Sequence, residues 1–345
     1  MQGLRPIKLL DLSSQHTMQE RRISYAEAIL EATDQAMSIS SDVIVLGQLS
    51  DLPSGMFGTT AGLVEKYGHQ RVHDFPVAEN LMTAVALGTA LTGHRPLIVH
   101  HRLDFMMYSI DVIVNWLSLW YFKSNGKSNV PVTIRAIVGK GWGQGPQHSK
   151  SLHSWFSHLP GLRVAVPATA FDAKGLLMES LLGATPTIIV EGRNLFSMTD
   201  HVPEEPYRIP FGRAFVRRSG EDLTLVAIGT MVPLALRAAE LAQAEGISVE
   251  VIDPRTLTPL DRETISGSVS KTGRLVVADP GWRSFGAAAE IITSVVEVVG
   301  NKLHSAPVRI TLPDSHTPMS MALEGHYYPS EANFCDAVAK AFYSK

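Results

Sequence analysis

Two side chains in this 345-residue sequence have the type and position needed for proton chemistry, and the first is Glu79. It stands between a short strand-like stretch, RVHDFP, and the segment ENLMTAVALGTAL, which is apolar at nearly every position. We expect that segment to form a buried helix over residues 79–91. An exposed acid there would gain only roughly 0.3–1 kcal/mol from the helix dipole. A buried carboxylate is costly without a partner, so Glu79 is a candidate for sharing a proton with a heterocyclic nitrogen.

His148 is the second candidate. It follows a glycine-rich run at residues 139–145, which itself follows a predicted strand at residues 132–138. This order places the histidine at the carboxyl edge of a parallel sheet, where open α/β sheets collect ligands. The glycine run matches neither standard phosphate loop, because Pro146 replaces the third glycine and no GK[ST] ending follows. We interpret it as a loop that lets backbone approach a ligand or partner, and structural and functional roles for His148 stay equally open.

The sequence supports neither a zinc site nor a serine-nucleophile site. The adjacent His100 and His101 end a predicted strand and would point to opposite faces, whereas zinc needs three or four convergent ligands. A G-x-S-x-G nucleophile motif does not occur in the sequence. Cys335 is the single cysteine, so a disulfide within the chain is impossible. We therefore expect no metal site made by this chain alone.

The elements that must position these residues alternate between strands and helices. Short apolar runs predict strands at residues 43–47, 72–75, 96–99, 132–138, 162–166 and 187–191. Helices are expected from the capping box Ser24-Tyr25-Ala26-Glu27 onward and at residues 63–67, 79–91, 110–122 and 170–182. Such alternation indicates a parallel sheet with helices on both faces.

A second block follows a break in the pattern. The stretch MTDHVPEEPYRIP carries three prolines and several acids. Beyond it, strands or helices are expected at residues 223–228, 232–245, 249–252, 274–278, 286–299 and 308–310. The predicted fold class is α/β, with two doubly wound α/β domains. The predicted limits are an N-terminal arm at 1–22, a first domain at 23–195, a linker at 196–210 and a second domain at 211–345.

Charge and hydropathy narrow the class of protein. The formal net charge is −3, which argues against nucleic acid or an anionic membrane surface as the main partner, since both call for a basic face. No apolar stretch approaches 18 residues without a charge or a breaker, so neither a membrane span nor a signal peptide is expected. These features predict a cytoplasmic enzyme or enzyme subunit.

Several collinear stretches resemble the β subunits of 2-oxo acid dehydrogenases (decarboxylating component), in the transketolase-like thiamine diphosphate superfamily. They are RVHDFPVAE from residue 71, GHRP from 93, QHS from 147, HLPGLRVAVPATAFDAKGLL from 158, VEVIDPRTLTPLD from 249 and KTGRLVVADPGW from 271. The resemblance covers about residues 22–340. It implies a first domain that binds the cofactor's pyrimidine, and a transketolase C-terminal-like domain that mainly supports assembly.

The resemblance also implies roles for particular residues. Glu79 matches the glutamate that protonates the cofactor's aminopyrimidine, and Phe105 matches an aromatic residue that packs on that ring. His148 matches an active-site histidine that faces oxygen atoms of the substrate and passes protons. Gln48 stands where these subunits commonly have an acid, and His101 replaces an apolar residue near the pyrimidine. Both are therefore expected beside the cofactor as well.

A missing motif implies a partner. The superfamily binds the cofactor's diphosphate and its Mg²⁺ through a GDG motif, and GDG does not occur in this sequence. The resemblance implies that thiamine diphosphate and Mg²⁺ are the cofactors. It further implies that an α-type subunit with the GDG motif holds the diphosphate and Mg²⁺, in an α₂β₂ heterotetramer that is active only when assembled.

Three functions remain open. The resemblance favours an oxidoreductase subunit that decarboxylates a 2-oxo acid and transfers the acyl or aldehyde fragment to a lipoyl-bearing acyltransferase or another acceptor. The alternative is a split transketolase or carboligase, a transferase that moves a two-carbon ketol unit; His100, His101 and His148 around the pocket would suit a polyhydroxylated ketose. A non-catalytic scaffold subunit is disfavoured by the joint presence of Glu79, Phe105 and His148.

Overall fold

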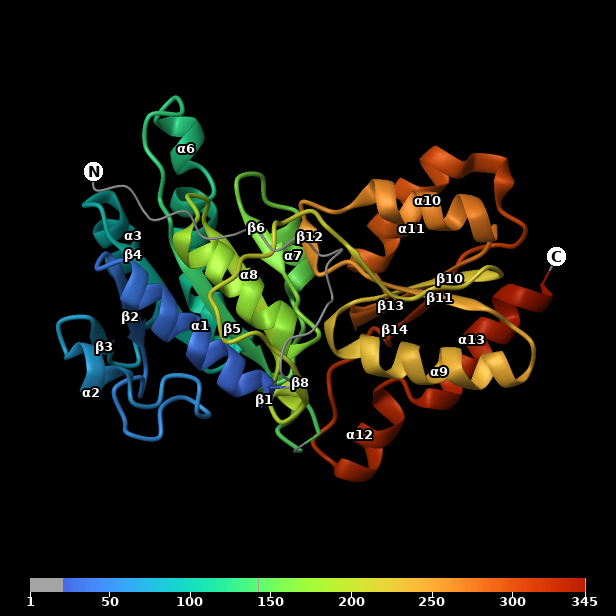
Figure 1. The fold of residues 1–345 in the computed structure, drawn as a ribbon, viewed down its shortest axis with the longest axis horizontal. Coiled ribbons are helices and arrows are strands. Elements are labelled where there is room, and N and C mark those ends of the chain that lie inside the picture. Colours follow the sequence, from blue (N-terminus) through green and yellow to red (C-terminus); the bar gives the residue numbers. More distant parts are fainter. Residues whose placement is uncertain (1–20, 142, 345) are drawn as a thin grey trace. The chain divides into compact units, whose positions relative to one another are not determined.

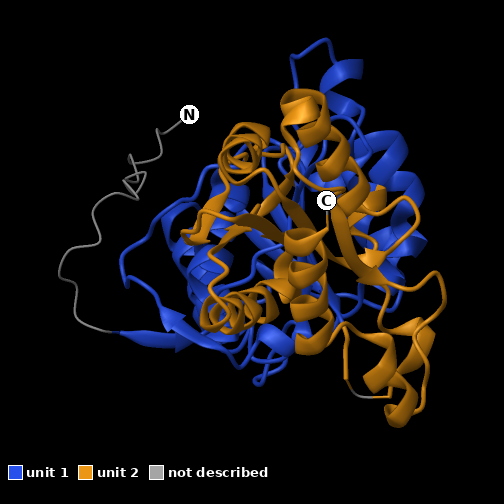
Figure 2. Ribbon diagram, turned by 90° about the vertical axis from the view of Figure 1, so that its right-hand side faces the viewer, with its two compact units in different colours: residues 1–138, 156–211 blue, residues 139–155, 212–345 orange. Residues whose placement is uncertain are grey.

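The computed structural model describes residues 21–141 and 143–344, so the arm predicted at 1–22 lies almost wholly outside the described residues. The chain divides into two compact units (Figure 2). Unit 1 comprises residues up to 138 and 156–211, and unit 2 comprises residues 139–155 and 212 onward. The predicted domain limits follow the chain without a break. The structure instead places the loop at 139–155 with the C-terminal unit, because that loop packs on later segments of the chain.

Unit 1 is built on six parallel strands in the order β6-β7-β5-β4-β2-β3. The strands are β2 (Val43–Gly47), β3 (Val72–Asp74), β4 (Arg95–His100), β5 (Thr133–Val138), β6 (Arg163–Ala165) and β7 (Thr187–Gly192). The chain leaves β2 for β3 on one side and returns to β4 on the other side of β2. The carboxyl end of β2 is therefore a topological switch point, where sheets of this kind bind ligands.

Helices cover both faces of this sheet. On one face α1 (Tyr25–Ile39), which begins at the predicted capping box, packs against α8 (Ala170–Leu182) (Figure 1). Val45 and Val99 belong to the core beneath these two helices, and alternate strand residues face the other side. There α3 packs on β4 and α5. The remaining helices are α2 (Leu63–Tyr67), α3 (Glu79–Leu91), α4 (Leu103–Met106), α5 (Ile110–Val112), a π-helical turn (Ile113–Leu117), α6 (Trp120–Lys123) and α7 (His153–Ser157).

The segment predicted as a linker, residues 196–210, packs on unit 1. Its strand β8 (Thr199–His201) pairs antiparallel with β1 (Arg22–Ser24) just before α1. Further along, the N–H of Ile209 donates to the carbonyl of Gly175, 3.1 Å away. A Cβ added to Gly175 would lie 2.5 Å from Ile209 and 2.7 Å from the Tyr207 ring, so only glycine permits this approach.

Unit 2 has five strands in the order β14-β13-β10-β11-β9, parallel except for the edge strand β9. They are β9 (Phe215–Arg218), β10 (Leu223–Ala227), β11 (Val249–Asp253), β13 (Leu275–Trp282) and β14 (Val308–Leu312); the short strand β12 (Thr256–Thr258) is not part of this sheet. Helices α9 (Val232–Ala244) and α13 (Glu331–Tyr343) cover one face, and α10 (Arg262–Thr272) and α11 (Ala287–Val299) cover the other (Figure 1). Helix α12 (Met321–Tyr327) lies outside these layers. The predicted α/β fold class is confirmed.

Helix α3 departs from the prediction of a helix buried on every face. Met82 and Ala86 are buried, but Leu81 and Leu91 are 53% and 39% exposed. Ala84 and Gly88 are exposed as well, so residues 81, 84, 88 and 91 form an apolar stripe along one side. Among the residues that the structure describes, the sheet covers only one side of this helix. Exposed apolar patches are typical of surfaces that contact other molecules. Among the helices that the structure describes, none is long and apolar enough to cross a membrane.

Candidate active site

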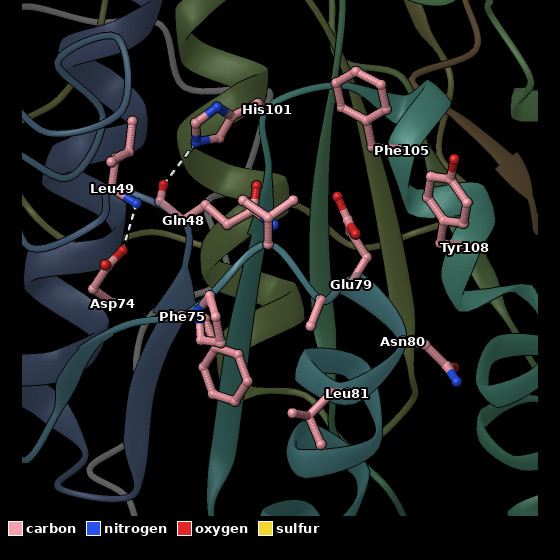
Figure 3. A pocket seen from close by; sticks show the side chains of 13 residues that line it. Gln48, Leu49, Asp74, Phe75, Glu79, Asn80, Leu81, His101, Phe105 and Tyr108 are labelled. Atoms are coloured by element: carbon pink, nitrogen blue, oxygen red, sulfur yellow. Dashed lines mark hydrogen bonds between the residues drawn. The ribbon is translucent and has the colours of Figure 1, made fainter.

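A pocket of about 1090 Å³ opens in unit 1 at the carboxyl ends of β2, β3 and β4 (Figure 3). This is the switch point of the sheet, where the strands diverge and leave backbone groups and side chains facing a common space. Thirteen residues line it: Gln48, Leu49, Asp74, Phe75, Pro76, Val77, Ala78, Glu79, Asn80, Leu81, His101, Phe105 and Tyr108. Four of the five predicted site residues, Gln48, Glu79, His101 and Phe105, thus meet in one pocket.

Glu79 is the first residue of α3 and is only 8% exposed. Its carboxylate makes no hydrogen bond or ion pair with any residue that the structure describes. Ala78, at the N-cap, offers the helix no side-chain hydrogen bond. The helix dipole favours a negative charge at this end, and the carboxylate lies on the wall of the open pocket. The carboxylate is therefore placed to bind a polar group that enters the pocket.

Gln48 and His101 are linked across the pocket wall. His101 donates from Nε2 to the carbonyl oxygen of Gln48 at 2.7 Å, and the N–H of Leu49 donates to Asp74 Oδ1 at 2.6 Å (Figure 3). Leu49 has a φ of 58°, an uncommon backbone conformation that these bonds hold in place. The side-chain amide nitrogen of Gln48 is buried and has no hydrogen-bond partner among the described residues. It belongs to a residue that lines the same pocket as Glu79.

The aromatic side of the pocket comes from α4 and the turn after it. Figure 3 shows the Glu79 carboxyl group directed toward the side where Phe105 and Tyr108 lie. Phe105 is half-buried, and Tyr108 is 72% exposed at the rim. The Thr83 hydroxyl lies 3.0 Å from the Glu79 carbonyl oxygen and 2.9 Å from the Ser109 hydroxyl. This contact ties the start of α3 to the aromatic segment.

The two adjacent histidines separate as their strand positions predict. His101 lines the pocket, whereas His100 is 2% exposed and is not among the lining residues. The Nε2 of His100 has no hydrogen-bond partner within the described part of the chain. Burial, with a smaller contribution from neighbouring His101, lowers the pKa of His100 to about 3. His100 is therefore a neutral side chain of the interior, and the expected ring of histidines around the pocket is wrong in this respect.

His148 lies in unit 2, on the loop at residues 139–155, and is not one of the residues that line the pocket of unit 1. Its carbonyl accepts a hydrogen bond from the N–H of Gly139 at 3.1 Å. Its Nδ1 lies 3.3 Å from the Gln144 carbonyl. The N–H groups of Gly141 and Gly143 donate to the Glu324 carboxylate at 2.8 and 3.2 Å. The glycine loop thus binds an acid of its own chain.

Asp74 and Tyr108 line the pocket but were not among the predicted site residues. Asp74 ends the strand that precedes Glu79, so its position at the carboxyl edge of a parallel strand was a usable signal. Tyr108 lies in a 3₁₀ turn (Met107–Ser109) directly after the four-residue helix α4, and the sequence contains no periodicity that would place its ring at the pocket rim.

Comparisons with known proteins agree with this geometry. Residues 21–198 match the transketolase pyrimidine-binding domain, and residues 212–333 match the transketolase C-terminal domain. The two domains of transketolase therefore define the class of protein. Among solved structures, a split-gene transketolase described as an inactive β4 tetramer superposes with a TM-score of 0.72 at 26% identity, covering 93% of this chain and 98% of that one.

Sequence relatives narrow the class. The β subunit of acetoin:2,6-dichlorophenolindophenol oxidoreductase from Cupriavidus necator is 38% identical, covering 93% of this chain and 97% of the relative. The β subunit of the pyruvate dehydrogenase E1 component from Acholeplasma laidlawii is also 38% identical, covering 92% and 98%. The chain belongs to the family of β subunits of thiamine diphosphate-dependent 2-oxo acid dehydrogenases, and the resemblance seen in the sequence is confirmed.

Proposed function

We propose that this chain is the β subunit of a heteromeric enzyme that decarboxylates a 2-oxo acid and passes the acyl or aldehyde fragment to an acceptor. One observation carries the proposal: the buried carboxylate of Glu79 lines an open pocket and has no partner among the described residues. Burying a carboxylate without a hydrogen-bond partner costs stability, and such groups occur at sites where a bound ligand supplies the partner. The family and the position of Glu79 in the pocket support the aminopyrimidine of thiamine diphosphate as the ligand class.

The residues of the pocket fit that ring. Glu79 can hold or release a proton at a ring nitrogen, and the unsatisfied amide nitrogen of Gln48 offers a hydrogen-bond donor. Phe105 offers an aromatic face for stacking, while His101 fixes the backbone of Gln48. When bound, thiamine diphosphate supplies a nucleophilic carbon and an electron sink for decarboxylation. In this proposal His148 passes protons to oxygen atoms of the substrate.

The proposal includes an α-type partner that carries the GDG motif and holds the diphosphate and Mg²⁺, because this sequence has no GDG. The surface supports assembly. Val77 and Tyr108 at the pocket rim are 83% and 72% exposed, and Leu81 belongs both to the rim and to the apolar stripe of α3. Apolar groups around a pocket that must exclude water are expected to be covered in the working enzyme. An α₂β₂ heterotetramer would cover them.

Reconstitution tests the proposal. The chain is mixed with an α-type subunit that carries the GDG motif, thiamine diphosphate and Mg²⁺, and assayed with a panel of 2-oxo acids. CO₂ release and reduction of 2,6-dichlorophenolindophenol are measured, with a lipoyl-bearing acyltransferase as a second acceptor. We expect turnover only with both subunits, and at least a 100-fold loss for Glu79→Gln. Full turnover by the isolated chain, or by the Glu79→Gln complex, would show that the proposal is wrong.

A split transketolase is the second candidate, because the solved split-gene transketolase shares the fold over nearly the whole chain. A ketose donor and an aldose acceptor, added to the same reconstituted complex, test it. The structure weakens one argument for this candidate: His100 lies in the interior and cannot bind a sugar hydroxyl in the pocket. The cytoplasmic location predicted from the sequence stays a prediction.

A further inference from the structure

Three polar side chains form a hydrogen-bonded chain inside unit 2. Ser151 and His153 come from the loop that carries His148, and Asp279 comes from β13 of the C-terminal domain. The Ser151 hydroxyl lies 2.9 Å from His153 Nδ1, and His153 donates from Nε2 to Asp279 Oδ1 at 2.8 Å. The side chains of His153 and Asp279 are both 0% exposed. Such a pair is costly to bury unless its geometry and its remaining hydrogen bonds are good.

Asp279 meets that condition. Besides His153 it accepts hydrogen bonds from the N–H groups of Gly281 at 2.7 Å and Ala288 at 2.9 Å, the latter in the first turn of α11. Burial alone would raise the pKa of Asp279, but the charge and hydrogen bond of His153 and the two backbone donors together lower it. Asp279 is therefore a carboxylate with fixed donors, and it binds the loop firmly.

A second attachment lies at the other end of the same loop. The N–H groups of Gly141 and Gly143 bind the carboxylate of Glu324, which is 4% exposed on α12. A Cβ added to Gly145 would lie 2.4 Å from Met319 Cγ, at a positive φ of 67°. Glycine is required there because the loop backbone lies directly against the Met319 side chain. Two carboxylates of the C-terminal domain thus hold the loop on both sides of His148.

We infer that Asp279 and His153, with Glu324, are positioning residues for His148, so that residues of the C-terminal domain fix the conformation of the loop that carries this histidine. The inference rests on the catalytic role proposed for His148. A glycine-rich loop has many conformations in the absence of tertiary contacts. Small displacements of a proton-transferring group are costly for the rate, and anchoring the loop from two sides prevents them.

The test compares two buried aspartates of unit 2. Asp279→Asn weakens the anchor. Asp253→Asn is the matched control, because Asp253 is also 0% exposed and accepts from Arg217 at 2.8 Å and from the Arg255 N–H at 2.9 Å. Hydrogen–deuterium exchange of the Gly139, Gly141 and Gly143 amides is read on the full chain, under conditions where both variants stay folded. We expect at least tenfold faster exchange in Asp279→Asn and wild-type exchange in Asp253→Asn.

The reconstituted enzyme supplies the second readout. We expect Asp279→Asn to lower kcat about tenfold, with the KM for the 2-oxo acid changed less than twofold, whereas Asp253→Asn keeps both constants. His153→Gln, which retains an N–H donor for Asp279, should recover part of the loss that His153→Leu causes. If Asp279→Asn folds poorly, Glu324→Gln is measured in the same way.

Equal exchange in the Asp279→Asn and Asp253→Asn chains would overturn the inference, as would an unchanged kcat in the Asp279→Asn enzyme. The exchange measurement needs no activity. If the wild-type complex proves inactive toward every substrate, the proposed function fails, while the exchange result still decides whether the C-terminal domain anchors the loop.

Discussion

Two buried carboxylates of this protein differ in what surrounds them. Asp279 in unit 2 accepts hydrogen bonds from His153, Gly281 and Ala288 within 2.9 Å. Glu79 in unit 1 is nearly as buried, yet no described residue binds its side chain. Asp279 lies within the parallel strand β13, and Glu79 begins the helix that follows the parallel strand β3, so a place beside a parallel sheet does not by itself explain the difference. The hydrogen-bond partners of Asp279 all belong to this chain. Glu79 faces an open pocket, so only a ligand or another chain can supply its partner.

The difference shows how burial should be interpreted in this fold. A buried acid with a full set of donors is an anchor, and its removal damages structure first. A buried acid without donors destabilises the free chain, and its removal should damage chemistry first. The pocket around Glu79 repeats this pattern in the unsatisfied amide of Gln48. Three substitutions test how far the contrast extends.

The largest effect is expected for Asp279→Asn. Removing the charge that His153 and two backbone N–H groups bind should lower the free energy of unfolding by about 3 kcal/mol at pH 7, measured by urea unfolding of the full chain. Because the pKa of Asp279 is lowered in the folded state, its contribution is complete above its ordinary value of 3.8. The contribution is lost as the pH falls through the lowered pKa. A decrease of less than about 0.5 kcal/mol in the free energy of unfolding would show that Asp279 does not hold the loop in place.

His100→Phe should change the pH dependence of stability in unit 1. The folded chain keeps His100 neutral, because its pKa is lowered to about 3, while the unfolded chain binds a proton below the ordinary value of 6.5. This group should therefore lower the free energy of unfolding of the wild type by about 1.4 kcal/mol for each pH unit below 6.5. His100→Phe should remove this contribution to the pH dependence. The exposed His94→Gln is the control, with the wild-type slope expected. Parallel curves for wild type and His100→Phe would contradict the interior position of His100.

Gln48→Ala should have the smallest effect. The amide nitrogen of Gln48 has no hydrogen bond to lose within the described chain, so the free energy of unfolding should change by less than about 0.5 kcal/mol. In the assembled enzyme the loss of one donor to the cofactor ring should raise the KM for thiamine diphosphate about two- to tenfold. An unchanged KM for thiamine diphosphate, or a marked decrease in the free energy of unfolding of the isolated chain, would show that Gln48 has a structural role and does not bind the cofactor.

Local sequence signals predicted much of the fold. The capping box at Ser24 does open α1, and the bounds predicted for α3 and α8 agree with the structure. Short hydrophobic runs located most of the parallel strands. Helix α10 was missed because its sequence, RETISGSVSKT, is polar and contains a glycine, so its burial comes from tertiary packing and not from a strong periodic pattern.

Glu79 was predicted from its place at the start of an apolar helix, whereas Gln48, His101 and Phe105 were predicted from the family resemblance. Glu79, Gln48, His101 and Phe105 meet because the ends of parallel strands share one edge. The attachment of the His148 loop was not predictable. Its anchors come from residues more than 120 positions later in the chain, and nothing in the local sequence indicates which carboxylate will meet which glycine. The apolar stripe of α3 was visible in composition, but periodicity could not tell a core face from a subunit contact.

The most direct test of this account measures Glu79→Gln twice on the same preparation. Turnover of the reconstituted enzyme is compared with wild type, and the free energy of unfolding of the chain is compared in urea. The account predicts at least a 100-fold loss of turnover, with stability unchanged within about 0.5 kcal/mol or increased. A variant that keeps full turnover, or one that loses about 3 kcal/mol of stability as Asp279→Asn should, would contradict it.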